Sequence, residues 1–337
     1  MIVLACLGIY YFFIKPAREN PQDNPETTIS EEIPTPAIVS EDDADKGDKD
    51  KKDNESVFDK LNDKMEEISS QKDKDESKKE EDDSEDENSQ PILIDYTELP
   101  VVDTTEYRGL EYYDVVFLGD SIFADNAGKN SIPSYFAAYT GARVYNLSRS
   151  GMCATFGISD WLDLPVATEC FIARSPANAY QTELFDAEAT RFAEDFDPDR
   201  KLIVFLDCCI NDYSMAAPII QGSDTAEDFY GAYRNVFRRI KEEYPWARIV
   251  TMTPYHYEVF NEGTDQNYFL YTQSTYADTL KGICAENNYL CIDLYNECPI
   301  DMSNKDVMLR DGLHPTDEGC DAVARTLARV LKEAIDY

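Results

Sequence analysis

Histidine is the scarcest residue type with catalytic potential, because the chain of 337 residues contains only His256 and His314. No Cys-x-x-Cys pair occurs among its nine cysteines. A structural zinc site needs four clustered Cys and His ligands, and neither residue type is clustered in that way. We therefore expect no metal ion and no other cofactor.

The sequence also does not have the features of a small protein that is stabilised by disulfides. Most of its cysteines are spread over a region that is long enough to build its own core. Cys208 and Cys209 end an apolar run, and adjacent cysteines rarely pair with each other. We interpret most of these thiols as small buried apolar groups.

Basic residues are few, with 31 Lys and Arg against 67 Asp and Glu, which gives a net charge of −36. Residues 17–90 and the rest of the chain are both acidic. A surface of this sign repels phosphate groups. We expect no nucleic-acid partner and no binding to anionic lipid headgroups, and we expect a neutral substrate.

The apolar run within residues 1–16 has no basic residues before it, and it is shorter than the roughly 20 residues of a membrane helix. We expect a truncated membrane anchor or a signal segment. An anchor would be the chain's only membrane contact, and the prediction is a single-pass protein of the cell membrane whose remainder lies outside the cell. Lys15 and Arg18 by themselves favour the opposite orientation, so the orientation stays open.

Residues 17–90 are dense in charged and polar residues and poor in aromatic ones, which predicts a disordered acidic linker. A few apolar residues in it recur at helical spacing and indicate either a docking helix or a transient one: Val57, Phe58, Leu61, Met65 and Ile68. Residues 91–337 have the length and composition of one globular domain.

Short apolar runs alternate with amphipathic segments in this domain, which is typical of an α/β fold with a parallel sheet and helices on both faces. The predicted strands are 114–119, 143–147, 201–207, 247–252 and 289–294. The predicted helices are 131–140, 225–244, 272–287 and 316–335. Between Gly151 and Lys201 the pattern fits either a lid subdomain or a helix pair that covers the sheet.

The first predicted strand ends in Gly119-Asp120-Ser121-Ile122, which delivers a serine to the carboxyl edge of the sheet. A serine hydroxyl needs a base before it becomes a good nucleophile. His314 follows Asp311 by three residues, so that a carboxylate is available to orient the imidazole. These are the parts of a Ser-His-Asp triad.

With these residues the chain resembles the SGNH (GDSL-like) hydrolase family. Four blocks occur in the family's order: Gly119 to Ile122, Asn146 to Gly151, Cys209 to Asp212, and Asp311 to His314. The resemblance implies a flavodoxin-like three-layer α/β/α fold with a sheet of about five strands. One departure is Cys209, which stands where the family's third block usually has glycine.

The resemblance also implies site roles. Ser121 would attack the ester, His314 would move the proton and Asp311 would orient His314, although Asp311 could instead only form the turn before Gly312. The oxyanion would be bound by the backbone N–H groups of Ser121 and Gly151 and the side-chain amide of Asn211. We assign structural roles to three further carboxylates, Asp120, Asp125 and Asp212, and a rim or packing role to His256.

The predicted function is a serine esterase that removes small acyl groups, such as O-acetyl, from a carbohydrate or cell-wall polymer. The same site could transfer the acyl group to an alcohol, and the fold could also serve as a non-catalytic surface binding module, for which Cys209 is the best support. An aromatic cluster could stack on sugar rings or pack against the body of the domain: Tyr255, Tyr257, Phe260, Tyr268, Phe269 and Tyr271.

Overall fold

The computed structural model describes residues 93–125, 128–158, 162–178, 182–257 and 271–336. The predicted anchor segment 1–16 and linker 17–90 lie outside these residues, as do Phe260, Tyr268 and Phe269. In the described part of the chain, no helix has both the length and the apolar character that crossing a bilayer requires.

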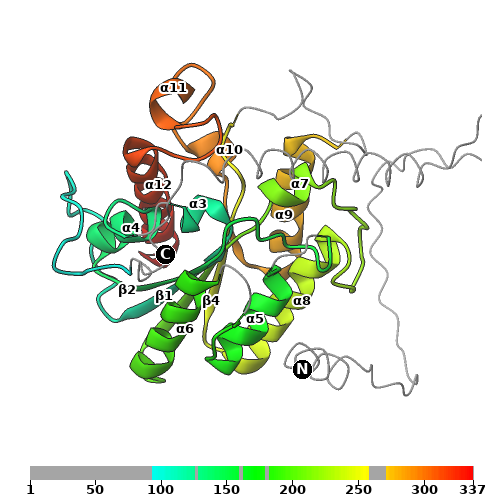
Figure 1. Ribbon diagram of the computed structural model, residues 1–337, viewed down its shortest axis with the longest axis horizontal. Helices are drawn as coiled ribbons and strands as arrows, with labels where there is room; N and C mark the ends of the chain where they lie inside the picture. The colour runs from blue at the N-terminus through cyan, green and yellow to red at the C-terminus, as the bar shows by residue number, and fades with distance from the viewer. Residues whose placement is uncertain (1–92, 126–127, 159–161, 179–181, 258–270, 337) are drawn as a thin grey trace, which may run out of the picture. The chain divides into compact units, whose positions relative to one another are not determined.

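A five-stranded sheet lies at the centre of the domain (Figure 1), and all of its neighbouring strands are parallel. Their order is β2 (Arg143–Ser148), β1 (Tyr113–Gly119), β3 (Lys201–Asp207), β4 (Arg248–Met252) and β5 (Leu290–Ile292). Crossover connections between parallel strands place helices on both faces. The predicted α/β class and the parallel sheet of five strands are confirmed.

Two groups of helices cover the sheet (Figure 1). On one face α4 (Ile132–Thr140) and α12 (Asp317–Asp336) pack against each other. The other group is α5 (Leu164–Ala173), α6 (Glu183–Asp195), α8 (Phe229–Glu243) and α9 (Gln273–Asn287). Four short helices lie in the connections: α3 (Ser121–Ala124), α7 (Ile210–Ser214), α10 (Leu294–Glu297) and α11 (Lys305–Met308).

Local capping explains where the predicted boundaries were wrong. The last strand ends at Ile292 and not at residue 294, because Asp293 is the N-cap of α10. Helix α8 begins after the predicted residue 225, because the Asp228 carboxylate accepts a hydrogen bond from Gly231 N (2.9 Å). An Asp at the N-cap satisfies backbone N–H groups that have no partner within the helix.

The segment between Gly151 and Lys201 forms the helix pair α5 and α6. Helix α6 packs on β2, and α5 packs on α8 and β1. Asp163 begins α5 by accepting a hydrogen bond from Val166 N (3.2 Å). The described residues therefore show a covering helix pair, and the alternative of a lid subdomain is wrong for them.

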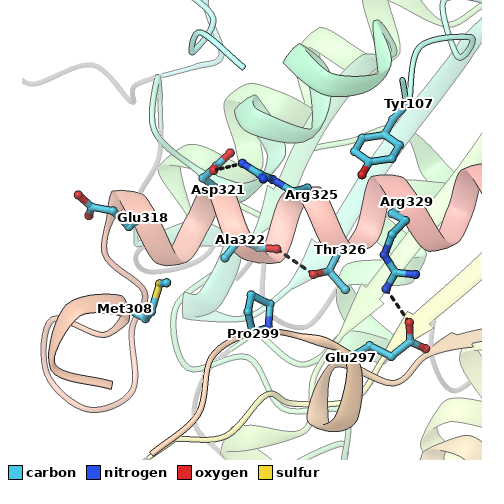
Figure 2. A pocket seen from close by; sticks show the side chains of 10 residues that line it. All are labelled: Tyr107, Glu297, Pro299, Met308, Glu318, Asp321, Ala322, Arg325, Thr326 and Arg329. Carbon is cyan, nitrogen blue, oxygen red and sulfur yellow. Dashed lines mark hydrogen bonds and ion pairs between the residues drawn. The ribbon is translucent and has the colours of Figure 1, made fainter. Parts of the chain in front are cut away.

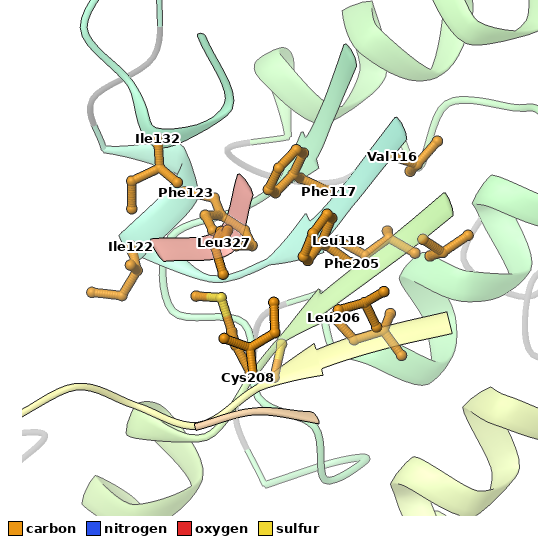
Figure 3. Close-up of a cluster of buried hydrophobic side chains, with 14 of the residues drawn as sticks. Val116, Phe117, Leu118, Ile122, Phe123, Ile132, Phe205, Leu206, Cys208 and Leu327 are labelled. Carbon is orange, nitrogen blue, oxygen red and sulfur yellow. The ribbon is translucent and has the colours of Figure 1, made fainter. Parts of the chain in front are cut away.

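The core is densest around β1, all seven residues of which are buried. The ring of Phe117 stacks on that of Phe205 in β3 (centroids 4.8 Å apart, 8° between planes) and meets the edge of Phe123 in α3 (4.8 Å). Figure 3 shows these rings together with Ile132 of α4 and Leu327 of α12. This packing holds the carboxyl end of β1, and the residues that follow it, in a fixed position.

The aromatic residues after β4 pack inward where the structure describes them. Tyr255 and Tyr257 are only 1% and 3% exposed. The Tyr255 hydroxyl donates to the carbonyl oxygen of Leu313 (2.7 Å). For these two tyrosines the packing interpretation is confirmed and sugar stacking is wrong.

We predict that residues 19–90 contribute nothing to the stability of the domain, because they are dense in charged residues and poor in apolar ones. A chain that starts at residue 91 should melt within about 2 °C of the full chain in calorimetry. A chain that starts at residue 112 is the control. It loses the buried Leu110 and the hydrogen bond from the Tyr96 hydroxyl to Val144 O (2.8 Å), and its Tm should fall clearly. A large loss of Tm for the first truncation would contradict the prediction.

Candidate active site

The Gly119-Asp120-Ser121 turn brings β1 directly into α3. A Cβ on Gly119 would lie 2.7 Å from the Phe123 ring and 2.8 Å from Asp207 O, so that only glycine fits between strand and helix. Asp120 is the N-cap of α3 and accepts a hydrogen bond from Ile122 N (2.9 Å). Ser121 is therefore fixed at the first position of α3, at the carboxyl edge of the sheet.

Three of the predicted residues form one chain of hydrogen bonds. Ser121 Oγ lies 2.9 Å from His314 Nε2, and His314 Nδ1 lies 2.7 Å from Asp311 Oδ2. Ser121 is 8% exposed, whereas the side chains of His314 and Asp311 are more accessible. The structure therefore brings together Ser121, His314 and Asp311 in the arrangement of a triad.

Asp311 both forms its turn and holds the imidazole. Its Oδ1 accepts hydrogen bonds from His314 N (2.7 Å) and Leu313 N (3.0 Å), while Oδ2 faces the ring. Gly312 lies between them with φ 82°, a region that favours glycine. Partial burial alone would raise the pKa of Asp311, but the hydrogen bonds from the His314 side chain and backbone lower it to about 2. The carboxylate is therefore ionised at neutral pH.

The residues predicted to bind the oxyanion lie at the start of α3 (Ser121), at the start of α7 (Asn211) and in the loop after β2 (Gly151). Gly151 has φ 79°, which favours glycine. Asn211 lies at the start of α7. Its Nδ2 donates to Met152 O (3.0 Å), the carbonyl oxygen of the residue after Gly151, and to Asp120 Oδ2 (3.3 Å). The side-chain amide thus lies between the loop of Gly151 and the residue before Ser121.

Cys209 fits the position where the family usually has glycine. It is the N-cap of α7 with φ −154° and is completely buried. This φ lies outside the left-handed region, so that the backbone path does not require glycine. Burial raises the pKa of its thiol well above the ordinary value, which keeps the sulfur protonated and makes it a small apolar group.

Three carboxyls are buried beneath the site. Burial and the neighbouring Asp207 raise the pKa of Asp120 well above its ordinary value, and burial raises the pKa of Asp207 to about 7. Burial also raises the pKa of Asp212 to about 6, against the effect of hydrogen bonds from Ala154 N (2.7 Å) and Thr155 N (2.9 Å). Asp120 and Asp212 have the structural roles predicted for them. The sequence analysis missed Asp207, whose only signal is its place at the end of an apolar strand.

Asp125 has a larger part in the site than predicted. Its Oδ2 lies 3.3 Å from His314 Nε2 and 3.1 Å from Nη2 of Arg310, and its Oδ1 accepts a hydrogen bond from the Ser150 hydroxyl. The sequence analysis assigned Asp125 a structural role and did not predict these contacts, because nothing in the sequence shows that the end of α3 faces the histidine loop. His256, by contrast, packs on the Tyr295 ring (centroids 4.0 Å apart), in keeping with its predicted packing role.

A separate cavity of about 450 Å³ lies along α12 (Figure 2). Its charged residues pair with one another, including Arg329 with Glu297 (2.8 Å) and Arg325 with Asp321 (3.0 Å). Neither Ser121 nor His314 lines it. In the described part of the chain, no group of three or more His, Cys, Asp or Glu side chains is arranged to hold a metal ion.

Comparison with known proteins agrees with this geometry. The sequence profile of the GDSL-like Lipase/Acylhydrolase family matches residues 117–322, which is more than half of the chain. The chain belongs to this family. It is therefore a carboxylic ester hydrolase of the SGNH (GDSL-like) type. No curated protein sequence matches it at a significant level.

Comparison with solved structures gives several similar proteins, of which the first, with a TM-score above 0.5, supports the fold. A protein from Lactobacillus plantarum has a TM-score of 0.51 and 22% identity, covering 66% of this chain and 97% of its own. An acetyl xylan esterase, AlAXEase, has a TM-score of 0.42 and 16% identity over 64% of this chain and 98% of its own. A member of the lipolytic G-D-S-L family from Veillonella parvula has a TM-score of 0.42 and 15% identity over 65% of this chain and 97% of its own.

We predict that Asn211→Ala lowers kcat on an aryl ester by roughly a hundredfold or more, because the predicted oxyanion site would lose one of its donors. Asn287→Ala is the matched control. Asn287 is also half-buried and also donates to one backbone carbonyl, Ile283 O (2.7 Å), but lies on α9, and its loss should leave kcat unchanged. An Asn211→Ala enzyme with normal kcat and a raised KM would make Asn211 a substrate contact instead.

We further predict that Asp207 lowers the stability of the protein as the pH rises. A carboxyl whose pKa is raised by folding adds stability below its unfolded pKa of about 4, and this contribution is lost as the pH rises through about 7. Asp207→Asn should therefore raise Tm relative to wild type more at pH 8 than at pH 5.

The control for this stability measurement is Asp224→Asn, because the side chain of Asp224 is 79% exposed. Its effect on Tm should be small at both pH values. If the Tm difference between Asp207→Asn and wild type is the same at pH 5 and pH 8, burial of Asp207 does not control the pH dependence of unfolding.

Proposed function

We propose that this hydrolase is a serine esterase that removes small acyl groups, with O-acetyl as the example, from a carbohydrate or cell-wall polymer. The observation that carries the proposal is the chain of hydrogen bonds from Ser121 Oγ through His314 to Asp311, at 2.9 Å and 2.7 Å. A nucleophile, a base and an orienting carboxylate within hydrogen-bonding distance are the parts that acyl transfer needs.

In the proposed mechanism His314 Nε2 takes the proton of Ser121 as the oxygen attacks the ester carbonyl. The imidazolium then gives this proton to the leaving alcohol, which breaks the C–O bond and leaves the acyl group on Ser121. Water repeats the sequence with His314 as base, which releases the carboxylic acid. Asp311, ionised because its pKa is about 2, stabilises the imidazolium in both halves.

The backbone N–H groups of Ser121 and Gly151 and the amide of Asn211 form the proposed oxyanion site. Asn211 suits this role because it donates hydrogen bonds without carrying a charge. Its amide already lies against Met152 O, beside Gly151. Small rotations of this side chain would redirect a donor from Asp120 toward a bound oxyanion.

The proposed substrate follows from charge and from the expected placement of the chain. A strongly acidic chain favours a neutral polymer over an anionic one. If residues 1–16 form an anchor and residues 17–90 a linker, the enzyme would act on polymers at the outer surface of the cell membrane. A non-catalytic binding module is less well supported. Its main support was Cys209 in place of the usual glycine of the third block, and the negative φ at Cys209 does not require glycine there.

The test is turnover of an aryl acetate by the full chain. We predict that Ser121→Ala and His314→Ala each lose several orders of magnitude in kcat/KM, and that the double variant is no slower than either, because the two residues act as one unit. A serine-directed covalent inhibitor should abolish the activity of the wild-type enzyme.

The matched control is His256→Ala, which removes the other histidine. His256 packs on Tyr295, so its loss should leave most of the activity. A His256→Ala enzyme as inactive as His314→Ala would overturn the assignment of the base. Aryl acetate turnover that persists in Ser121→Ala would overturn the assignment of the nucleophile.

A further inference from the structure

A second carboxylate, Asp125, contacts the imidazole of His314 at Nε2, whereas Asp311 contacts Nδ1. Asp125 is the C-cap of α3, and its Oδ2 lies 3.3 Å from His314 Nε2, the nitrogen that also contacts Ser121 Oγ. Its side chain is 26% exposed, so that water screens it only in part. The resemblance to the family assigns no role to this position.

The electrostatic energy of this contact is unfavourable when His314 is neutral and favourable when His314 is protonated. Nδ1 faces the ionised Asp311, so the neutral ring carries its proton on Nδ1 and a lone pair on Nε2. The Asp125 carboxylate then faces that lone pair, which is unfavourable. Once Nε2 takes the proton of Ser121, the same oxygen faces an N–H of a cation, which is favourable.

We propose that Asp125 is a positioning residue that selectively stabilises the imidazolium of His314 during acyl transfer, and that Arg310 limits this effect. The inference rests on the proposed function. Because the stabilisation exists only after proton transfer, it lowers the barrier and does not merely tighten ground-state binding.

The positive charge of Arg310 partly offsets the negative charge of Asp125. Its Nη2 lies 3.1 Å from the same Oδ2 of Asp125 that faces Nε2, so that it draws negative charge away from the imidazole. Among the described residues, Asp311 contacts Nδ1 of the ring, and Asp120 directly precedes Ser121 in the chain. Burial and Asp207 raise the pKa of Asp120, so Asp120 adds less negative charge than an ionised carboxylate would.

Asp125 also connects the loops of the site. Its Oδ1 accepts a hydrogen bond from Ser150, the residue before Gly151, while Oδ2 contacts Arg310 and His314. A merely structural role would therefore be to hold these loops together. The experiment must separate this role from an electrostatic one.

The test compares Asp125→Asn and Arg310→Gln in the full chain by the pH dependence of kcat/KM. Its acid limb reports the ionisation of the base in the free enzyme. Asp125→Asn keeps the shape and should move the acid limb to lower pH by about half to one pH unit, with a severalfold loss on the plateau. Arg310→Gln should move the limb to higher pH. Glu297→Gln, which removes a carboxylate paired with Arg329 (2.8 Å) outside the site, should move nothing.

A second readout does not depend on activity. In a His256→Ala background, His314 is the only histidine, so that NMR titration follows a single imidazole. Asp125→Asn should lower its midpoint and Arg310→Gln should raise it, even if no ester is turned over and the proposed function fails. Loss of kcat and Tm in Asp125→Asn with unmoved midpoints would show a structural role only and overturn the inference.

Discussion

The hydrogen bond between Ser121 and His314 joins positions 193 residues apart, and most of the domain serves to bring these two side chains together. Ser121 depends on β1, whose buried side chains fix the strand between β2 and β3. His314 depends on the loop before α12, which packs on α4. Because α4 follows Ser121 in the chain and α12 follows His314, the contact between these helices holds the segments of Ser121 and His314 together at the carboxyl edge of the sheet.

Tyr255 secures the histidine loop from a third direction. Its buried hydroxyl donates to Leu313 O, one residue before His314. Breaking this bond would leave a buried polar group without a partner, which costs more than an exposed hydrogen bond contributes. The position of His314 thus depends on the segment after β4 as well as on α12.

The sequence predicted those parts of the fold that depend on local pattern. Apolar runs located β1 and β3 because strands buried on both faces carry little else. The three triad residues followed from their motifs. The end of β5 was missed because the chain turns into a short helix at Asp293, whose backbone carbonyl accepts hydrogen bonds from Asn296 N and Glu297 N. No apolar pattern contains this information.

The sequence analysis missed Asp207, and it did not predict the contact of Asp125 with His314, for a different reason. Carboxylates are common after strands and in turns, so their residue types carry little information. Their effects depend on which loop they face and how deeply they are buried, and both properties arise only when distant segments pack together. The environment of Cys209 was equally inaccessible, because one backbone angle decides whether the position needs glycine.

The two ends of segment 258–270 are joined where Gln273 Nε2 donates to Tyr255 O (2.6 Å). Gln273 is 7% exposed, and Tyr255 in turn holds the histidine loop. Tyr255 and Gln273, two described residues that flank the segment, are both buried and hydrogen-bonded to each other. Insertions, deletions or grafted sequences between Tyr255 and Gln273 can therefore be introduced while the histidine loop keeps its place, which makes this stretch of sequence a suitable position for engineering.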